Sequence, residues 1–240
     1  MVPNESQKAA LQKIYGCTRF VYNLGLETKK AVYASAKKTL SSVELINQLP
    51  ELKEAAPWLK ECPSQALQMS LRNLDEAYQR FFKGGGFPRF KNKHNKQSFQ
   101  LPQGVKVDID KGKIFLPKLE WVDCILHRAF KGDIKTVTVS KTVTGKYFVS
   151  VLVDNQARVP AKKPVTETTA VGIDFGITRF LTLSDGTHYG NQRLLRQNLR
   201  KLKVAQRTLS RRYKKGGREQ SRGYLRQRRI VARLHERVAN

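Results

Sequence analysis

The sequence has 240 residues, of which 46 are Lys or Arg and 19 are Asp or Glu, so its formal net charge is +27. This excess excludes an ordinary, weakly charged enzyme and predicts a polyanionic partner. A membrane surface is the competing polyanion, but there is no run of about 18 apolar residues and no apolar signal-peptide segment, which favours nucleic acid. The three cysteines have no zinc-ligand spacing and predict reduced thiols in a cytoplasm.

Residues 1–86 predict a helical lobe. Asn4 and Gln7 have the spacing of a capping box, and we expect the helix that they start to break after Gly16. A second helix should then run to about Lys37.

Two more helices are expected in this lobe. Ser41 and Ser42 precede a short helix that Pro50 should close. The strongest helical pattern follows and ends at the glycines of 84–86. Its apolar face, which we interpret as ordinary core, consists of Leu67, Leu71, Leu74, Tyr78 and Phe81.

Residues 86–102 mix basic side chains with three phenylalanines. Basic residues suit backbone phosphates, and aromatic rings suit base or sugar stacking. A charge run alone is usually solvated surface, but solvated loops rarely keep three phenylalanines. We therefore predict nucleic-acid contacts here by Arg89, Lys91, Lys93 and Lys96.

Short strands are expected next, and their spacing predicts a small β-barrel or sandwich. The strand patterns lie at 105–109, 113–116, 123–130, 134–139 and 147–153. Residues 155–168 are polar, contain two prolines and predict a linker.

Residues 169–190 predict a three-stranded meander with an aspartate on its first strand. Val171, Ile173 and Phe175 alternate and should face the core, which places Asp174 on the opposite face. Phosphodiester cleavage with two Mg²⁺ ions needs hard oxygen ligands held rigidly, which a strand provides. Taken alone, the pattern equally allows Asp174 simply to end a strand or cap a turn.

The last fifty residues hold seventeen Lys and Arg against two acidic residues. Two narrow apolar stripes on either side of residues 214–217 predict a helical hairpin with basic outer faces. Like charges repel, so a phosphate backbone along the hairpin is expected, with disorder in its absence as the alternative. The predicted contacts are Arg196, Arg200, Lys203, Arg207, Arg211, Arg212, Lys214 and Lys215.

Several short motifs in order together resemble the TnpB family, RNA-guided DNA endonucleases encoded by insertion sequences and long described as transposases. The matching segments are 19–23 (RFVYN), 67–82, 86–91 (GFPRFK), 116–119 (LPKL), 172–176 (GIDFG) and 184–186 (SDG).

The resemblance implies an α+β fold in three parts. A helical recognition lobe (1–86) is inserted into a small wedge-type β-barrel (87–168, with the linker). The first part of a RuvC domain of RNase H-like fold, with the basic hairpin, follows at 169–240. It also implies a guide RNA paired with target DNA, and a protein that reads a short DNA motif beside the target. Asp174 matches the first catalytic Mg²⁺ ligand, and Gln68 and Gln103 fall near motif-reading positions.

The sequence also departs from the family. Members usually begin with a β-strand before the position of Asn4, so we expect one barrel strand to be absent. They continue beyond the position of Asn240 with a catalytic glutamate, paired cysteines for zinc and a final aspartate. Because one carboxylate does not hold two metal ions, we expect no zinc site and no DNA cleavage by this polypeptide alone.

Three functions stay open: a piece of an RNA-guided nuclease, a guide-RNA-dependent DNA-binding regulator without nuclease activity, and a non-functional transposon remnant that folds poorly. A ribosomal-type RNA-binding protein would have the charge, but it has no need of the pattern at 172–176.

Overall fold

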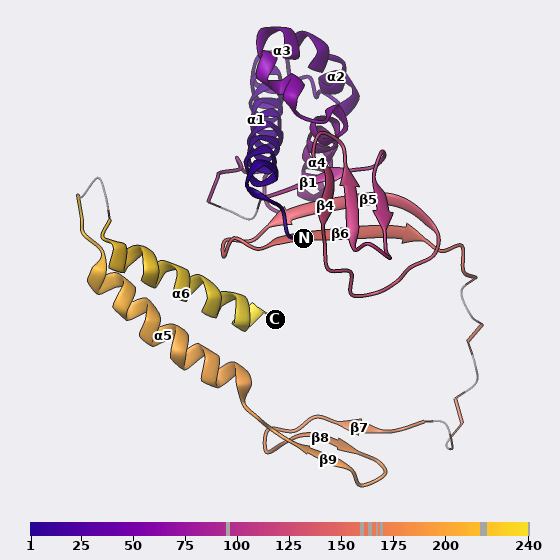
Figure 1. The fold of residues 1–240 in the computed structure, drawn as a ribbon, viewed down its shortest axis with the longest axis vertical. Helices are drawn as coiled ribbons and strands as arrows, with labels where there is room; N and C mark the ends of the chain where they lie inside the picture. The colour runs from indigo at the N-terminus through magenta and orange to yellow at the C-terminus, as the bar shows by residue number, and fades with distance from the viewer. Residues whose placement is uncertain are drawn as a thin grey trace. The chain divides into compact units, whose positions relative to one another are not determined.

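A computed structural model shows a chain of two units, Met1–Ala157 and Arg158–Asn240 (Figure 1). The structure describes residues 1–94, 97–158, 161–162, 165–166, 168, 170–216 and 220–239. Each unit has a hydrophobic core of its own.

The first unit begins with one long helix, α1 (Glu5–Ala36). The predicted capping box is present, since the Asn4 side chain accepts from the Gln7 backbone and the Gln7 side chain accepts from the Asn4 backbone. The predicted break at Gly16 is wrong, because α1 continues through it. The helix ends where Lys37 adopts a left-handed conformation (φ 52°).

Short helices connect α1 to the second long helix: α2 (Ser42–Asn47), α3 (Leu49–Ala55) and the 3₁₀ helix η1 (Pro57–Glu61). Ser41 caps α2 as predicted, through a capping box with Glu44. Pro50 does not close a helix. It lies in the first turn of α3, where a proline loses no hydrogen bond.

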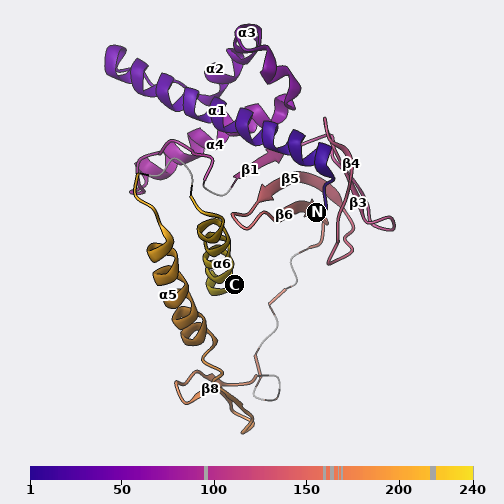
Figure 2. The same cartoon turned by 60° about the vertical axis from the view of Figure 1, so that its left-hand side comes forward.

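Helix α4 (Ser64–Phe82) packs along α1, and both views show the pair running beside the β-strands of this unit (Figure 2). Its predicted apolar face is core, with Leu67 and Leu74 fully buried. Gly25 of α1 allows the close approach, because a Cβ there would lie 2.8 Å from Cδ2 of Leu71.

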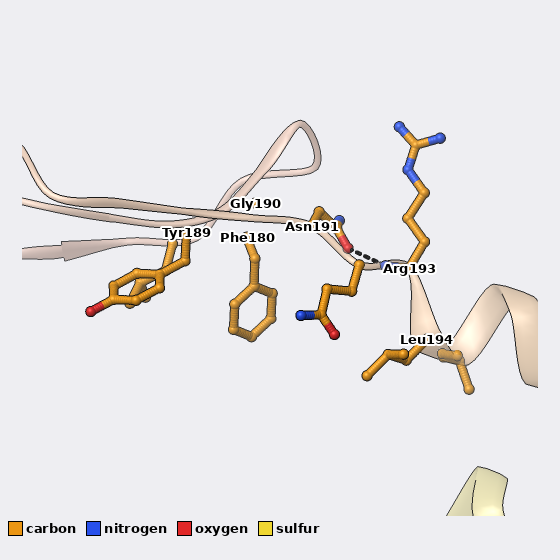
Figure 3. Close-up of a pocket in the computed structure, with 9 residues that line it drawn as sticks. Phe180, Tyr189, Gly190, Asn191, Arg193 and Leu194 are labelled. Carbon is orange, nitrogen blue, oxygen red and sulfur yellow. Dashed lines mark hydrogen bonds between the residues drawn. The ribbon is translucent and has the colours of Figure 1, made fainter.

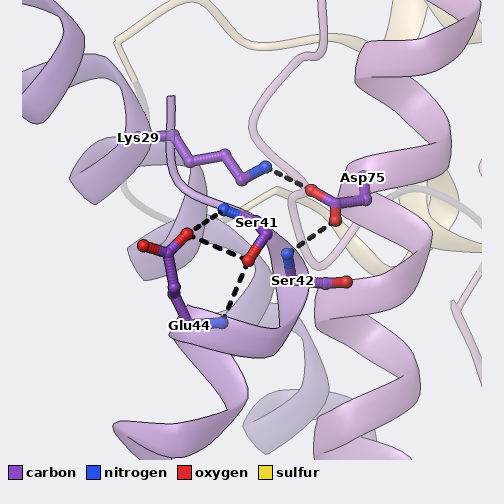
Figure 4. Close-up of polar contacts among 5 residues, drawn as sticks. All are labelled: Lys29, Ser41, Ser42, Glu44 and Asp75. Atoms are coloured by element: carbon purple, nitrogen blue, oxygen red, sulfur yellow. Dashed lines mark hydrogen bonds and ion pairs between the residues drawn. The ribbon is translucent and has the colours of Figure 1, made fainter. Parts of the chain in front are cut away.

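A buried ion pair joins these helices (Figure 4). The Lys29 ammonium of α1 donates to Asp75 of α4, whose second oxygen accepts from the Ser42 backbone at 2.6 Å. Burial alone raises the pKa of Asp75, but the hydrogen bonds from Lys29 and Ser42 outweigh it, and the pKa is lowered. The carboxylate therefore fixes both α1 and the start of α2 to α4.

Two three-stranded antiparallel sheets complete the unit. The first has the order β1 (Gln97–Leu101), β5 (Asp133–Lys141), β6 (Tyr147–Asp154), and the second the order β2 (Lys106–Asp108), β3 (Lys113–Leu116), β4 (Glu120–Asp123). Within the described residues neither sheet closes into a barrel, so the predicted barrel is not confirmed. The strand expected at 123–130 is wrong, since β4 ends at Asp123.

The sheets and helices share one core. Phe99 of β1 lies opposite Val139 of β5, and its ring centroid lies 5.3 Å from that of Tyr15 on α1. The strand β1 was not predicted from the sequence, because its residues belong to the basic and aromatic segment.

The second unit contains the sheet β7 (Ile173–Asp174), β8 (Arg179–Leu183), β9 (His188–Gly190), followed by α5 (Leu194–Arg212) and α6 (Arg222–Ala239). The predicted meander and helical hairpin are both confirmed. The core of the hairpin is small and consists of Leu202, Ala205, Val231 and Leu234.

Replacing Asp75 tests the contribution of the buried ion pair. We expect Asp75→Asn to lower the free energy of unfolding of the first unit by about 3 kcal/mol at pH 7, because Lys29 is left buried and unpaired. The lowered pKa of Asp75 means that this stabilisation is present above its unfolded-state pKa, about 4, and is lost as the pH falls through the folded-state pKa.

The measurement is urea unfolding followed by the fluorescence of Trp58 and Trp121, both in the first unit. The difference in free energy of unfolding between the wild type and Asp75→Asn should become smaller in acid. Asp110→Asn, at an exposed turn residue, is the matched control and should change stability by less than about 0.5 kcal/mol. Equal stability of the wild type and Asp75→Asn at pH 7 would contradict the account.

Candidate nucleic-acid interface and the Asp174 strand

Asp174 lies on β7, where it pairs with Thr182 of β8. The start of the strand is held by Ser184, whose Oγ accepts from the Gly172 N–H at 3.0 Å. Asp174 is exposed, as expected for the face away from a core. The face predicted to be core is exposed as well, since Val171, Ile173 and Phe175 keep 56%, 58% and 71% of their surface accessible.

The other described carboxylates of this unit, Asp185 and Glu236, do not complete a metal site with Asp174. Asp185 is engaged in its own turn, where the Thr187 N–H donates to it at 2.8 Å and lowers the pKa of the carboxyl. Glu236 belongs to α6. Within the described residues, no group of three His, Cys, Asp or Glu side chains could hold a metal ion. The residues that the structure describes therefore do not fit a two-metal centre.

A hollow of about 640 Å³ lies between β8, β9 and the start of α5 (Figure 3). Phe180, Tyr189 and Leu194 supply apolar walls. Asn191 shapes the entry to α5, because its Oδ1 accepts from the Arg193 N–H at 2.9 Å and its Nδ2 donates to the Ile177 carbonyl at 2.9 Å. Arg193 has a left-handed backbone (φ 49°), and the first turn of α5 begins from it.

Five of the six predicted cations of α5 lie on one exposed face. Their spacing of 4, 3, 4 and 4 residues keeps five side chains within one stripe of a helix, opposite the buried face of Leu202 and Ala205. This stripe, the α5 stripe, consists of Arg196, Arg200, Lys203, Arg207 and Arg211.

Arg212 turns toward the partner helix, where its Nη1 donates to the Gly223 carbonyl at 3.1 Å. Lys214 and Lys215 are exposed in the connecting turn. Gln220 holds that turn, since its side chain bonds to both the N–H and the carbonyl of Lys214.

Helix α6 has cations at the same spacing as α5, although none of them was among the predicted contacts. Five exposed arginines follow the same spacing of 4, 3, 4 and 4 residues and form the α6 stripe: Arg222, Arg226, Arg229, Arg233 and Arg237. The helical period alone would have found them, because the buried Val231 and Leu234 mark the opposite face. Gln227 fastens the two helices where it is buried, donating to the Ala205 carbonyl at 3.0 Å.

The predicted contacts of the first unit lie on the segment after α4. Arg89, Lys91 and Lys93 are exposed, and Lys96 lies outside the described residues. Asn23 of α1 holds this segment, because its amide bonds to both the carbonyl and the N–H of Lys91, at 2.9 and 2.8 Å. The residue Lys91 is exposed as a whole, but its ammonium lies 3.9 Å from the centroid of the Tyr22 ring, and local desolvation of the ammonium lowers the pKa of Lys91.

The regions of Gln68 and Gln103 are brought together. Gln103 accepts a hydrogen bond from Nε2 of Gln65, one helical turn before Gln68 on α4, at 3.4 Å. A second bond, from Asn73 to Gln100 at 3.1 Å, joins the same helix to β1.

The described part of the chain contains no helix long and apolar enough to cross a membrane.

Two family models match parts of the chain. Residues 148–240 match the OrfB_IS605 family described as "Probable transposase", and residues 1–38 match its "Helix-turn-helix domain". Within the second range the structure has one continuous helix, α1. The chain belongs to this transposase family of insertion sequences, the TnpB-type family that its motifs resemble.

Individual relatives carry related names. The chain is 36% identical to "Putative RNA-guided DNA endonuclease InsQ" of Escherichia coli strain K12 and 34% identical to "Putative RNA-guided DNA endonuclease" of Streptomyces pristinaespiralis. Both matches cover 99% of this chain, which spans 58% of each relative. A third relative, "Virulence protein VsdF" of Salmonella dublin, is 33% identical over 39% of this chain and 89% of its own length.

Proposed function

We propose that this chain is the nucleic-acid-binding part of an RNA-guided DNA endonuclease system of a transposable element, and that guide RNA and target DNA are its partners. The observation that carries the proposal is the pair of matched cationic stripes on α5 and α6. The names of the two longer relatives support the same conclusion.

The stripes need a polyanion. The last fifty residues contain seventeen positive side chains and two acidic ones, so the chain cannot neutralise this segment itself. At 1.5 Å per residue, each stripe extends for about 22 Å along its helix. A duplex presents about a dozen phosphate charges over that length, and bound phosphates would remove the repulsion within both stripes.

A duplex that includes the guide fits this surface because the protein needs no sequence-reading groups on it. In RNA-guided recognition, base pairing reads the sequence and the protein holds the heteroduplex by its shape and backbone. We assign the reading of a short DNA motif to the Gln68 and Gln103 region, where amide side chains from α4 and from the loop after β1 meet. Amides can read base edges by paired hydrogen bonds.

Asp174 is assigned as one ligand of a Mg²⁺ site of RNase H-like type whose remaining ligands are not among the described residues. Magnesium would supply a polarised phosphate and an activated water, and this chain would contribute a single carboxylate on β7. A guided DNA-binding regulator is the second candidate, favoured because the described residues place no metal-binding group of three His, Cys, Asp or Glu side chains around Asp174. A cytoplasmic location is also proposed, supported by three buried free cysteines.

Neutralising part of the α5 stripe tests the proposed binding surface. The triple variant Arg200→Gln, Lys203→Gln, Arg207→Gln should weaken binding to a labelled DNA duplex of about 20 base pairs. Each lost phosphate contact removes about 0.9 from the slope of log K against log salt, so the slope should fall by about 2 to 3. Fluorescence anisotropy across a salt series measures it.

The matched control removes the same charge elsewhere. Lys111→Gln, Lys113→Gln, Lys135→Gln also lowers the net charge by three, but these ammonium groups lie 3.7, 3.6 and 3.6 Å from Asp108, Asp123 and Asp154. Because carboxylates already neutralise them, the slope should hardly change. Equal slopes for the two triple variants would overturn the assignment of the α5 stripe.

A cleavage assay tests the role of Asp174. The chain, incubated with Mg²⁺, a guide RNA and a matching DNA, should leave the DNA intact, because one carboxylate does not hold two metal ions. Asp174→Ala should bind the nucleic acid as the wild type does. Cutting by the wild type that disappears in Asp174→Ala would show a complete site and contradict the proposal.

A further inference from the structure

Helix α1 contains two glycines with different surroundings. Gly25 is needed for packing against α4, because a Cβ would meet Leu71 and Leu74. A Cβ at Gly16 would meet nothing within 4 Å. Glycine is among the least favourable residues in a helix interior, and no contact with the described residues requires it at position 16. A partner outside the chain that approaches the helix backbone closely would require a glycine at this position.

Three surface hollows meet at this point of α1. Gly16 lines two of them, of about 600 and 340 Å³, and Arg19 lines both the larger one and a third of about 190 Å³. Because neighbouring hollows share Gly16 or Arg19, we treat the three together as one surface, which we call the α1 groove. Its larger compartments are in the size range of small-molecule sites.

The walls of the α1 groove are exposed aromatic rings. Phe20 and Trp58 meet edge to face with ring centroids 5.0 Å apart, yet remain 39% and 46% exposed. Phe90, 47% exposed, lines the larger hollow. The neighbouring Lys91 is held by Asn23, whose Nδ2 donates to the Lys91 carbonyl and whose Oδ1 accepts from the Lys91 N–H. Rigid exposed rings of this kind offer faces on which a planar group can stack.

Cations border the groove. Arg19 donates to Gln97 at 2.7 Å and keeps further N–H donors, and the Lys30 ammonium lies 5.3 Å from the Phe90 ring centroid. Within the described chain, neither Arg19, Lys30 nor Lys91 forms an ion pair. Among the acidic residues, Glu61 is paired with Lys13 at 2.6 Å, whereas Glu27 lines the larger hollow directly.

We propose that the α1 groove binds unpaired nucleotides, with a base stacked on Trp58 or Phe90 and the backbone crossing α1 at Gly16. Glu27 repels phosphate from the larger hollow, so a base occupies it and the phosphates lie toward Arg19, Lys30 and Lys91. Proteins bind single strands by stacking aromatic side chains on the bases and placing cationic side chains along the phosphate backbone. The inference rests on the proposed nucleic-acid function but concerns a surface of the first unit, apart from the stripes of α5 and α6.

Trp58 reports on the groove by itself once Trp121 is removed, because the chain has two tryptophans. Full-length Trp121→Phe is titrated with a labelled twelve-nucleotide oligothymidylate and with a duplex of equal length. We expect the single strand to quench Trp58 fluorescence, while the duplex changes it several-fold less. Equal quenching by the duplex would overturn the assignment to unpaired nucleotides.

A second variant places a side chain at position 16, where the strand is proposed to cross α1. In the Trp121→Phe background, Gly16→Gln should weaken the quenching titration at least tenfold without loss of helicity, since glutamine is the better helix former. Gly16→Ala, which places only a Cβ in the path of the strand, should weaken the quenching titration less than Gly16→Gln does, and Ser35→Gln, at an exposed site near the end of α1, should stay within twofold of the parent.

Anisotropy of the labelled strand, recorded in the same titration, separates two failures. Binding with unchanged Trp58 fluorescence, or quenching unaffected by Gly16→Gln, would overturn the α1 groove and leave the stripes in place. If the single strand gives neither signal while the duplex still binds, the groove alone is overturned, and if neither the single strand nor the duplex binds, the groove and the proposed function are overturned together.

Discussion

Uncompensated positive charge is the constraint on which the second unit depends. Each stripe contains four neighbouring pairs of like charges at helical spacing, and each pair costs about 0.2 to 0.5 kcal/mol. The two stripes together therefore oppose the hairpin by roughly 2 to 4 kcal/mol, comparable to the gain from burying one or two leucine side chains. Among the described residues, the hairpin core has four buried apolar side chains. Neutralisation by phosphate would thus decide how firmly α5 and α6 hold together.

Local signals predicted where elements begin, and tertiary packing decided where they end. The capping boxes at Asn4 and Ser41 involve residues within one turn, so the sequence was sufficient to predict them. Gly16 and Pro50 were misjudged because both are tolerated in context: one lies in a helix long enough to continue, the other in a first turn. The strand β1 depends on pairing with β5, distant in sequence.

The candidate site was likewise predictable where it depends on local patterns, but not where it depends on contacts between distant residues. Alternation predicted the strand of Asp174, but it identifies a face without saying what covers it, and Ile173 and Phe175 are exposed. The bonds from Gln65 to Gln103 and from Asn23 to Lys91 join residues 38 and 68 positions apart, which no local pattern predicts. The α6 stripe is different, because it could have been predicted from the helical period.

The most direct test of the central claim is hydrogen exchange of residues 194–239 in the full chain, with and without an RNA–DNA heteroduplex of about 20 base pairs. The account predicts that the heteroduplex slows exchange of α5 and α6 amides at least tenfold, and that about 1 M salt abolishes the effect. Unchanged exchange in α5 and α6, with the heteroduplex bound elsewhere on the chain, would contradict it.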